Sequence, residues 1–271
     1  MPNLPGILID PGWLEGRLGR PSLRPVDLRD TDAYRSGHIP GAAHVDLSEL
    51  GSSVAGRDND LISPEEFSAL MTARGISSGD TVVAYDDQWG LAAARLVWAC
   101  HYYGHSRAAA LNGGWDRWQD EGRPVSQGEG GREGRGSADR FQARPRSDVR
   151  AETDWILGRI EAGDAVLLDV RTPAEFENGH LPGALSWDWF NAVPAGSWNA
   201  SRDPQELRTE WRELGLDPSL EVTVYCRSGM RAAHTWLVLR NSGFDRVRLY
   251  DGSWQQWSME VEGAEEGSDG D

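Results

Sequence analysis

Two patterns of apolar residues alternate along this chain: short runs rich in apolar residues and longer stretches with helical spacing. The runs are typical of strands buried on both faces and lie at 25–29, 81–85, 108–111, 165–170, 221–225 and 246–250. Apolar residues recur three or four positions apart, as in helices, at 63–75, 91–104, 113–122, 203–215, 230–243 and 252–257. Strands separated by helices predict an α/β fold with mostly parallel sheets and helices on both faces.

The sequence predicts where the helix at 63–75 begins. Ser63 precedes Pro64 and an apolar repeat, and Glu66 stands three positions after the serine. This spacing predicts a capping box, in which the serine hydroxyl and the glutamate carboxylate satisfy the first free amides of the helix.

The chain contains the same pattern twice. VDLRDTDAYRSGHIPGAAHVDL, which begins at Val26, matches LDVRTPAEFENGHLPGALSWDW, which begins at Leu168, at an offset of 142 positions. Downstream, VVAYDDQWGLAAARLVW pairs with VTVYCRSGMRAAHTWLV at an offset of 140, and LNGGWDRW pairs with YDGSWQQW at 139. Several blocks in the same order predict a duplicated domain.

Composition places the boundaries between the copies. Residues 125–148 are rich in glycine, arginine and serine and lack apolar periodicity, which predicts a linker. We therefore expect a first domain at 1–124 and a second at 149–259, followed by a solvated acidic tail at 260–271.

Charge excludes several classes of partner. The formal net charge is −16 and all 27 basic residues are arginine, so we expect neither nucleic acid nor a membrane surface as a partner. No apolar run reaches the length of a membrane span, and the amino-terminal segment lacks the features of a signal sequence. The 2 cysteines occupy unlike contexts, which favours a reducing compartment and predicts a cytoplasmic protein.

One cysteine stands where ligands of parallel sheets gather. Cys226 ends the strand 221–225 and precedes the helix at 230–243. In such a turn, successive amides can converge on one point and stabilise an anion, and Gly229 permits a positive φ. The amides that can do so belong to Arg227, Ser228, Gly229, Met230 and Arg231. Together with the two arginine charges, this loop favours the thiolate and predicts a nucleophilic cysteine.

These features together resemble the rhodanese sulfurtransferases in their tandem two-domain form. The resemblance rests on the loop CRSGMR, the upstream block DVRTPAEFENGHLPGA and the downstream DGSW, and it covers nearly the whole chain. It implies that Cys226 takes the outer sulfur of a donor such as thiosulfate, becomes a persulfide cradled by the loop amides, and passes the sulfur to a thiol or to cyanide. Two half-reactions imply ping-pong kinetics. The resemblance implies no metal and no organic cofactor.

The resemblance also implies that the first domain is catalytically silent. Asp86 stands opposite Cys226, and a carboxylate cannot carry sulfur. The first domain is expected to pack against the second and to form one wall of the cleft. Asp86 and Asp87 alone are weak evidence for a cation site.

Other conspicuous residues are interpreted as structural. Cys100 has helical spacing from apolar neighbours and is expected in the core. Asp27 and Arg29 recur as Asp169 and Arg171, which favours a structural pair. The histidines of GHIPGA and GHLPGA occur in both copies, so we expect them to serve the fold, as we expect of the tryptophans near the end of each copy.

The sulfur donor is left open by the sequence. Arg227-Ser228 shares one residue with the arginine-lysine pair of many thiosulfate enzymes of the family and one with the glycine-serine of mercaptopyruvate enzymes. Glu175 stands where tandem enzymes tend to carry a substrate-binding arginine. Thiosulfate is favoured because Arg227 puts a positive charge beside the nucleophile, and 3-mercaptopyruvate is the alternative donor.

Two further classes of function stay open. A cysteine and an arginine that bracket an amide loop also describe phosphatases and arsenate reductases, although the related phosphatases have one more residue than the four between Cys226 and Arg231. A rhodanese module that binds a partner without catalysis is the other alternative.

Overall fold

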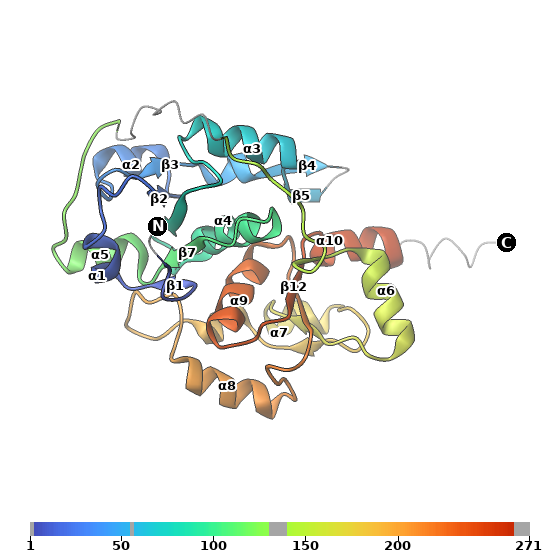
Figure 1. Ribbon diagram of the computed structural model, residues 1–271. Helices are drawn as coiled ribbons and strands as arrows, with labels where there is room; N and C mark the ends of the chain where they lie inside the picture. Colours follow the sequence, from blue (N-terminus) through green and yellow to red (C-terminus); the bar gives the residue numbers. More distant parts are fainter. Residues whose placement is uncertain (1–2, 55–56, 130–139, 263–271) are drawn as a thin grey trace.

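The computed structural model describes residues 3–54, 57–129 and 140–262, without the side chains of 52–59. It contains two five-stranded sheets whose strands all run parallel, one from each half of the chain. The first half lies above the second in Figure 1. The α/β fold with two parallel sheets was predicted from the alternation of strands and helices and is confirmed.

The first sheet has the order β1-β7-β6-β2-β3. Its strands are β1 (Leu8–Ile9), β2 (Leu23–Asp27), β3 (Ala43–His44), β6 (Thr81–Tyr85) and β7 (Ala108–Leu111). Its helices are α1 (Pro11–Glu15), α2 (Thr31–Ser36), α3 (Pro64–Ala73), α4 (Leu91–Tyr102) and α5 (Gly114–Asp120). A short 3₁₀ helix, η1 (Leu47–Leu50), leads into the antiparallel hairpin β4 (Gly51–Val54) and β5 (Arg57–Leu61).

The second sheet repeats this order as β8-β12-β11-β9-β10, read from the equivalent edge. Its strands are β8 (Arg150–Ala151), β9 (Leu167–Asp169), β10 (Leu185–Ser186), β11 (Val222–Tyr225) and β12 (Val247–Tyr250). Its helices are α6 (Thr153–Ala162), α7 (Pro173–Glu177), α8 (Pro204–Glu213), α9 (Met230–Asn241) and α10 (Ser253–Trp257), with the short helices η2 (Trp189–Ala192) and η3 (Ser258–Glu262).

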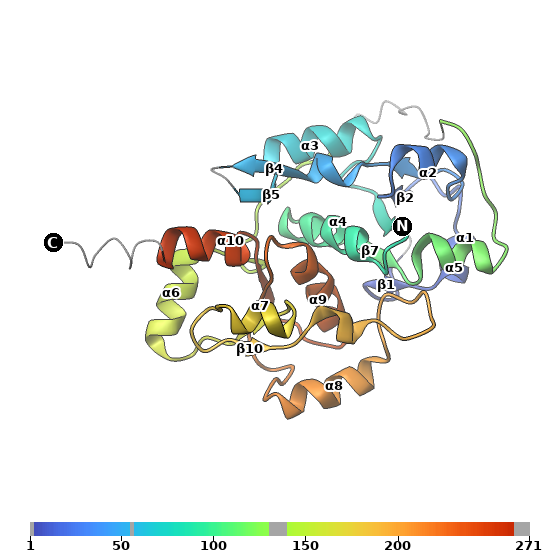
Figure 2. The same cartoon turned by 180° about the vertical axis from the view of Figure 1, so that it is seen from behind.

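The two halves meet along one helix from each. Helix α4 packs against α9, and Figures 1 and 2 show these two helices side by side between the sheets. Both helices are buried along most of their length, because each faces its own sheet on one side and the other half on the other. This explains why their apolar residues are not confined to one stripe.

A repeated set of contacts ties each GH[IL]PGA turn to its sheet. Arg29 donates to Asp27 at 2.7 Å and to the Gly37 carbonyl at 2.6 Å, and Arg171 makes the same two contacts with Asp169 and Gly179, each at 2.6 Å. All four charged side chains are nearly inaccessible to solvent. The prediction of a structural pair is therefore confirmed in both copies.

Tyrosine and histidine complete the same scaffold. The hydroxyl of Tyr85 accepts the Ile39 amide, and the hydroxyl of Tyr225 accepts the Leu181 amide. His38 Nδ1 lies 3.0 Å from the Tyr34 carbonyl and His180 Nδ1 lies 3.0 Å from that of Phe176. Each tyrosine ends the strand that precedes the 86 or 226 position, so this scaffold fixes the strand end on which the candidate site stands.

The predicted capping box at Ser63 is present, with the serine hydroxyl bound to the Glu66 amide and the Glu66 carboxylate bound to the Ser63 amide. In the segment predicted to be a linker, residues 130–139 lie outside the described residues, and Phe141 is buried against Phe67 of the first half. Of the predicted acidic tail, 263–271 also lie outside them. None of the helices within the described ranges has the length and apolar character that a membrane crossing requires.

Candidate functional site

Cys226 lies at the carboxyl end of β11, the central strand of the second sheet, and its side chain is almost fully buried. Its amide donates to Ser253 Oγ at 3.1 Å, and its carbonyl accepts the Trp254 amide at 3.0 Å. The next carbonyl, of Arg227, accepts the Gln255 amide. The start of α10 thus holds the backbone at the cysteine in place.

The loop after the cysteine turns directly into helix α9. Gly229 is the N-cap and has a φ of 83°, a left-handed conformation in which a side chain is strained. Arg227 is exposed, Ser228 and Met230 are half-buried, and Met230 is the first helical residue. The amino-terminal end of α9, with its partial positive charge, therefore lies beside the sulfur position.

Arg231 lies in the first turn of α9 and forms a two-pronged ion pair with Glu175 from α7. Nη1 and Nη2 of the arginine lie 2.7 and 2.8 Å from the two carboxylate oxygens. The hydrogen bonds that Arg231 donates to Glu175 hold the pKa of Arg231 above its ordinary value, and the charge and hydrogen bonding of Cys226 act in the same direction. Arg231 therefore lies between the Glu175 carboxylate and the cysteine sulfur. The sequence placed Arg231 in the loop by its amide and its charge, and gave no signal for its pairing with Glu175.

The equivalent loop of the first half holds a carboxylate. Asp86 lies at the end of β6 and is buried, and its Oδ1 accepts the amides of Gln88 at 2.9 Å and Gly90 at 2.8 Å. Its Oδ2 accepts the Ala93 amide at 2.8 Å. Burial raises the pKa of Asp86, while the amide hydrogen bonds oppose that rise. In this copy the backbone amides converge on one oxygen-bearing group, as expected of an anion nest.

The two loops differ in length, which corrects the sequence alignment. Gly90 and Gly229 are both left-handed N-caps, of α4 and α9 respectively. Tyr85 and Tyr225 end the preceding strands at an offset of 140, whereas the caps and the helices behind them match at 139. The single offset of 140 predicted for the whole block is therefore wrong in its helical part, because the loop of the first half contains one more residue. Arg231 is equivalent to Ala92.

The first half also contributes to the surroundings of the cysteine loop. Arg95 of α4 donates to Asp251 across the domain boundary at 2.5 Å, and both side chains are fully buried. An added Cβ at Gly229 would lie 2.7 Å from the Asp251 carboxylate and 2.8 Å from Arg95 Nη1. The ion pair therefore lies directly against the loop. No sequence motif signals this pair, because the two charges are 156 positions apart.

Ser253 is a second contact that the sequence did not single out. It adopts a φ of 52°, which is unusual for a residue with a side chain, and its buried hydroxyl both accepts the Cys226 amide and donates to the Tyr250 carbonyl. Gly114 has the same conformation in the first copy. The difference between GGW and GSW in the duplicated block was the available signal.

The family model for the rhodanese-like domain matches residues 10–121 and 152–260. The chain belongs to the rhodanese-like family. A thiosulfate sulfurtransferase of Corynebacterium glutamicum is 36% identical over 277 residues, which cover 95% of this chain and 89% of that protein. The sulfur carrier protein TtuD of Thermus thermophilus is 33% identical, with 93% of this chain and 94% of the relative covered.

Solved rhodanese-fold structures agree with this arrangement. The 3-mercaptopyruvate sulfurtransferase SseA of Escherichia coli superposes with a TM-score of 0.80 at 26% identity, covering 92% of this chain and 99% of SseA. EanB, solved with a persulfide and with ergothioneine, superposes with a TM-score of 0.80 at 25% identity over 94% of this chain and 68% of EanB.

Two other residues of this rhodanese-like protein that the sequence singled out, Cys100 and Asp86, lie in structural contacts. Cys100 is buried inside α4, and burial raises the pKa of its thiol, so the prediction of a core cysteine is confirmed. In the part of the chain that the structure describes, no group of three or more histidine, cysteine or acidic side chains could hold a metal ion. Asp86 and Asp87 were weak evidence for a cation site from the sequence, and in the structure amides surround the Asp86 carboxylate.

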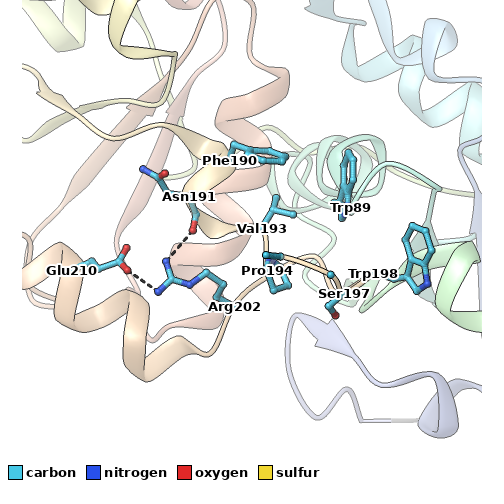
Figure 3. Close-up of a pocket in the computed structure, with 11 residues that line it drawn as sticks. Trp89, Phe190, Asn191, Val193, Pro194, Ser197, Trp198, Arg202 and Glu210 are labelled. Atoms are coloured by element: carbon cyan, nitrogen blue, oxygen red, sulfur yellow. Dashed lines mark hydrogen bonds and ion pairs between the residues drawn. The ribbon is translucent and has the colours of Figure 1, made fainter.

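A large hollow of about 940 Å³ lies elsewhere on the rhodanese-like fold, between η2, α8 and the loop that holds Trp89. In Figure 3, Trp89 and Phe190 lie next to each other on one side of it, and Arg202 is tied to Glu210 and to the Asn191 carbonyl. No residue of the loop from Cys226 to Arg231 lines it. We therefore separate this hollow from the candidate active site.

Proposed function

We propose that this protein is a sulfurtransferase that moves a sulfane sulfur from thiosulfate to a thiol or to cyanide through a persulfide on Cys226. In the first half-reaction the thiolate attacks the outer sulfur of thiosulfate, the sulfur–sulfur bond of the donor breaks, and sulfite leaves with the bonding electrons. In the second, the acceptor attacks the outer sulfur of the persulfide and the Cys226 thiolate is restored.

The occupied nest of the first domain carries this proposal. Its loop presents converging amides to the Asp86 carboxylate at 2.8 to 2.9 Å. In the second domain Cys226 stands at the same strand end, before an equivalent glycine-capped helix. A loop that binds one anion in this way is suited to hold a thiolate or a persulfide, because either carries its charge where the amides point. The first domain, with its own carboxylate in place of a nucleophile, is proposed to be catalytically silent.

Thiosulfate is proposed as the sulfur donor because of the charge beside Cys226 and the names of the related proteins. Arg227 is exposed directly after the nucleophile, and the relative from Corynebacterium glutamicum is named a thiosulfate sulfurtransferase. The second candidate donor is 3-mercaptopyruvate, which the superposition on SseA and the Ser228 of the loop favour. No metal or organic cofactor enters either scheme. A cytoplasmic location, with small sulfur compounds as the only partners, remains part of this proposal.

Intact-mass measurement tests the proposal. We expect wild-type protein treated with thiosulfate and desalted to gain about 32 Da, the mass of one sulfur atom. Cyanide should remove the gain and produce thiocyanate. Cys226→Ser should gain nothing, whereas Cys100→Ala, the matched control at the buried cysteine, should gain the same mass as wild type.

Other outcomes decide between the alternatives. A mass gain with 3-mercaptopyruvate and none with thiosulfate would establish the second donor. Turnover of an aryl phosphate without any persulfide would favour the phosphatase alternative. A protein that shows neither reaction would be a binding module, and the proposed sulfur transfer would be wrong.

A further inference from the structure

The Glu175–Arg231 ion pair stands at the opening of the candidate site. The two side chains are 33% and 21% exposed, whereas the sulfur they adjoin is almost fully buried. Glu175 Oε2 also accepts the amide of Thr172 at 3.1 Å and its hydroxyl at 2.9 Å. These donors, Arg231 above all, lower the pKa of Glu175 to about 2. The carboxylate is therefore ionised at every pH at which the protein is expected to work.

The pair exists only in the copy that has the cysteine. Glu175 is the third residue of α7 after its N-cap Thr172, and the same position after the N-cap Asp30 of α2 is Ala33. Arg231, two residues after the glycine cap of α9, is matched by Ala92. The aspartate–arginine, histidine and tyrosine contacts of the scaffold recur in both copies. A pair missing from the silent copy is not needed by the fold, so we attribute it to the sulfur site.

The pair changes the charge that an incoming donor meets. Without the carboxylate, Arg227 and Arg231 would present two positive charges near the sulfur. With it, the negative charge of Glu175 offsets the positive charge of Arg231, so a negative donor near the sulfur meets one net positive charge in place of two. The penalty should grow in proportion to the charge of the donor, because the interaction energy of two charges is proportional to their product.

On this basis we infer that Glu175 is a specificity-determining residue, which disfavours dianionic sulfur donors relative to donors of lower charge. The inference rests on the proposed sulfur transfer. Thiosulfate carries two negative charges, whereas an alkanethiosulfonate such as methanethiosulfonate carries one and transfers its outer sulfur in the same way. Cys226 attacks that sulfur, the sulfur–sulfur bond breaks, and a sulfinate leaves in place of sulfite. The two donors thus differ chiefly in charge.

The test compares kcat/KM for the two donors in wild type and in Glu175→Gln. In ping-pong kinetics this quantity reports only the first half-reaction, whatever the acceptor. Glutamine can preserve the capping box of α7 and still accept from Arg231. We expect kcat/KM to rise about threefold for methanethiosulfonate, the effect of one partly exposed charge pair, and about tenfold, its square, for thiosulfate. The difference between the two donors in this rise should shrink at about 0.5 M salt, where the Debye length falls to about 4 Å.

Glu177→Gln is the matched control, because Glu177 is an exposed glutamate on the same short helix. It removes the same charge and should leave the ratio of the two donors within about twofold of wild type, since an exposed charge is screened by solvent. A Glu175→Gln enzyme in which both donors lose or gain by the same factor would overturn the inference, and would instead show that Glu175 only orients Arg231.

The failure of this inference can be told from the failure of the proposed function. If wild type gains no sulfur on Cys226 from either donor, sulfur transfer itself is wrong and the inference falls with it. If wild type forms the persulfide and Glu175→Gln leaves the donor ratio unchanged, only the role of Glu175 is wrong.

Discussion

The buried ion pair between Arg95 and Asp251 makes the most demanding prediction for the architecture. It joins the two domains, with a 2.5 Å hydrogen bond between side chains that are 2% and 0% exposed. Arg95→Met keeps most of the side-chain length and removes the charge. Asp251 would then be left buried, and its remaining partners among the described residues would be the Leu61 amide at 3.1 Å and the Arg150 guanidinium at 3.7 Å.

The expected loss in the free energy of unfolding of Arg95→Met follows from the buried, uncompensated charge of Asp251. Removal of one partner of a buried pair typically costs about 3–5 kcal/mol. We expect about 3 kcal/mol here, the lower end, because two contacts to Asp251 remain. For a chain of this size each kcal/mol corresponds to roughly 2–4 °C, so the melting temperature should fall by about 6–12 °C.

Differential scanning calorimetry and urea unfolding followed by tryptophan fluorescence would measure the change. Adding Asp251→Asn to Arg95→Met should recover part of the loss, because the buried charge is gone while an oxygen still accepts the Leu61 amide. Arg146→Met is the matched control: its pair with Asp148 is exposed at both ends, so the expected cost is below about 1 kcal/mol. If Arg95→Met cost no more than this control, the reasoning about the domain boundary would be refuted.

Three shorter predictions concern the two loops. Asp86→Ala should destabilise the protein by about 2–4 kcal/mol, measured by urea unfolding, because three amides of the loop and of the first turn of α4 lose their acceptor; Asp86→Asn should cost less. Gly229→Ala should slow persulfide formation in the mass assay by at least about tenfold, since its Cβ would press on Asp251 and Arg95 at a φ of 83°; an unchanged rate would show that the loop is not held as described. The pKa of Glu175 is lowered to about 2 in the folded protein. Ionised Glu175 therefore stabilises the folded protein above the ordinary pKa of a glutamate, and this contribution to the free energy of unfolding is lost as the pH falls toward 2. The stability difference between wild type and Glu175→Gln, about 1 kcal/mol near neutral pH, should therefore vanish near pH 2 in unfolding titrations, and a difference that grows on acidification would contradict the assignment.

Most of the fold could be predicted from local pattern. The strand 81–85 and the helices after Ser63 and Gly229 follow from apolar runs, a capping box and a glycine cap, which act over a few residues. Short elements such as β1, β3, β8 and β10 were missed, because two-residue strands contain no readable period. Helices α2 and α7 were also not predicted, because five or six residues contain too little of a helical period, and α6 was missed as well.

The candidate site also has a part that could be predicted from the sequence and a part that could not. The place of Cys226 at a strand end before a glycine-capped helix was set by neighbours in sequence. The residues around its loop, Arg95, Glu175, Asp251 and Ser253, come from three other segments of the chain, and their contacts depend on how the two domains and the elements α7 and α10 pack.

By itself the sequence determined the duplication, the α/β class, the cysteine at the strand end of the second copy and the carboxylate that stands there in the first copy, because these depend on residue identity and on short-range periodicity. Tertiary structure alone decided which charges meet: that Glu175 neutralises Arg231 beside the sulfur, and that Arg95 crosses the domain boundary to Asp251. Ion pairs form between side chains that are distant in sequence only after the sheets and helices have fixed their directions, so no local pattern encodes them.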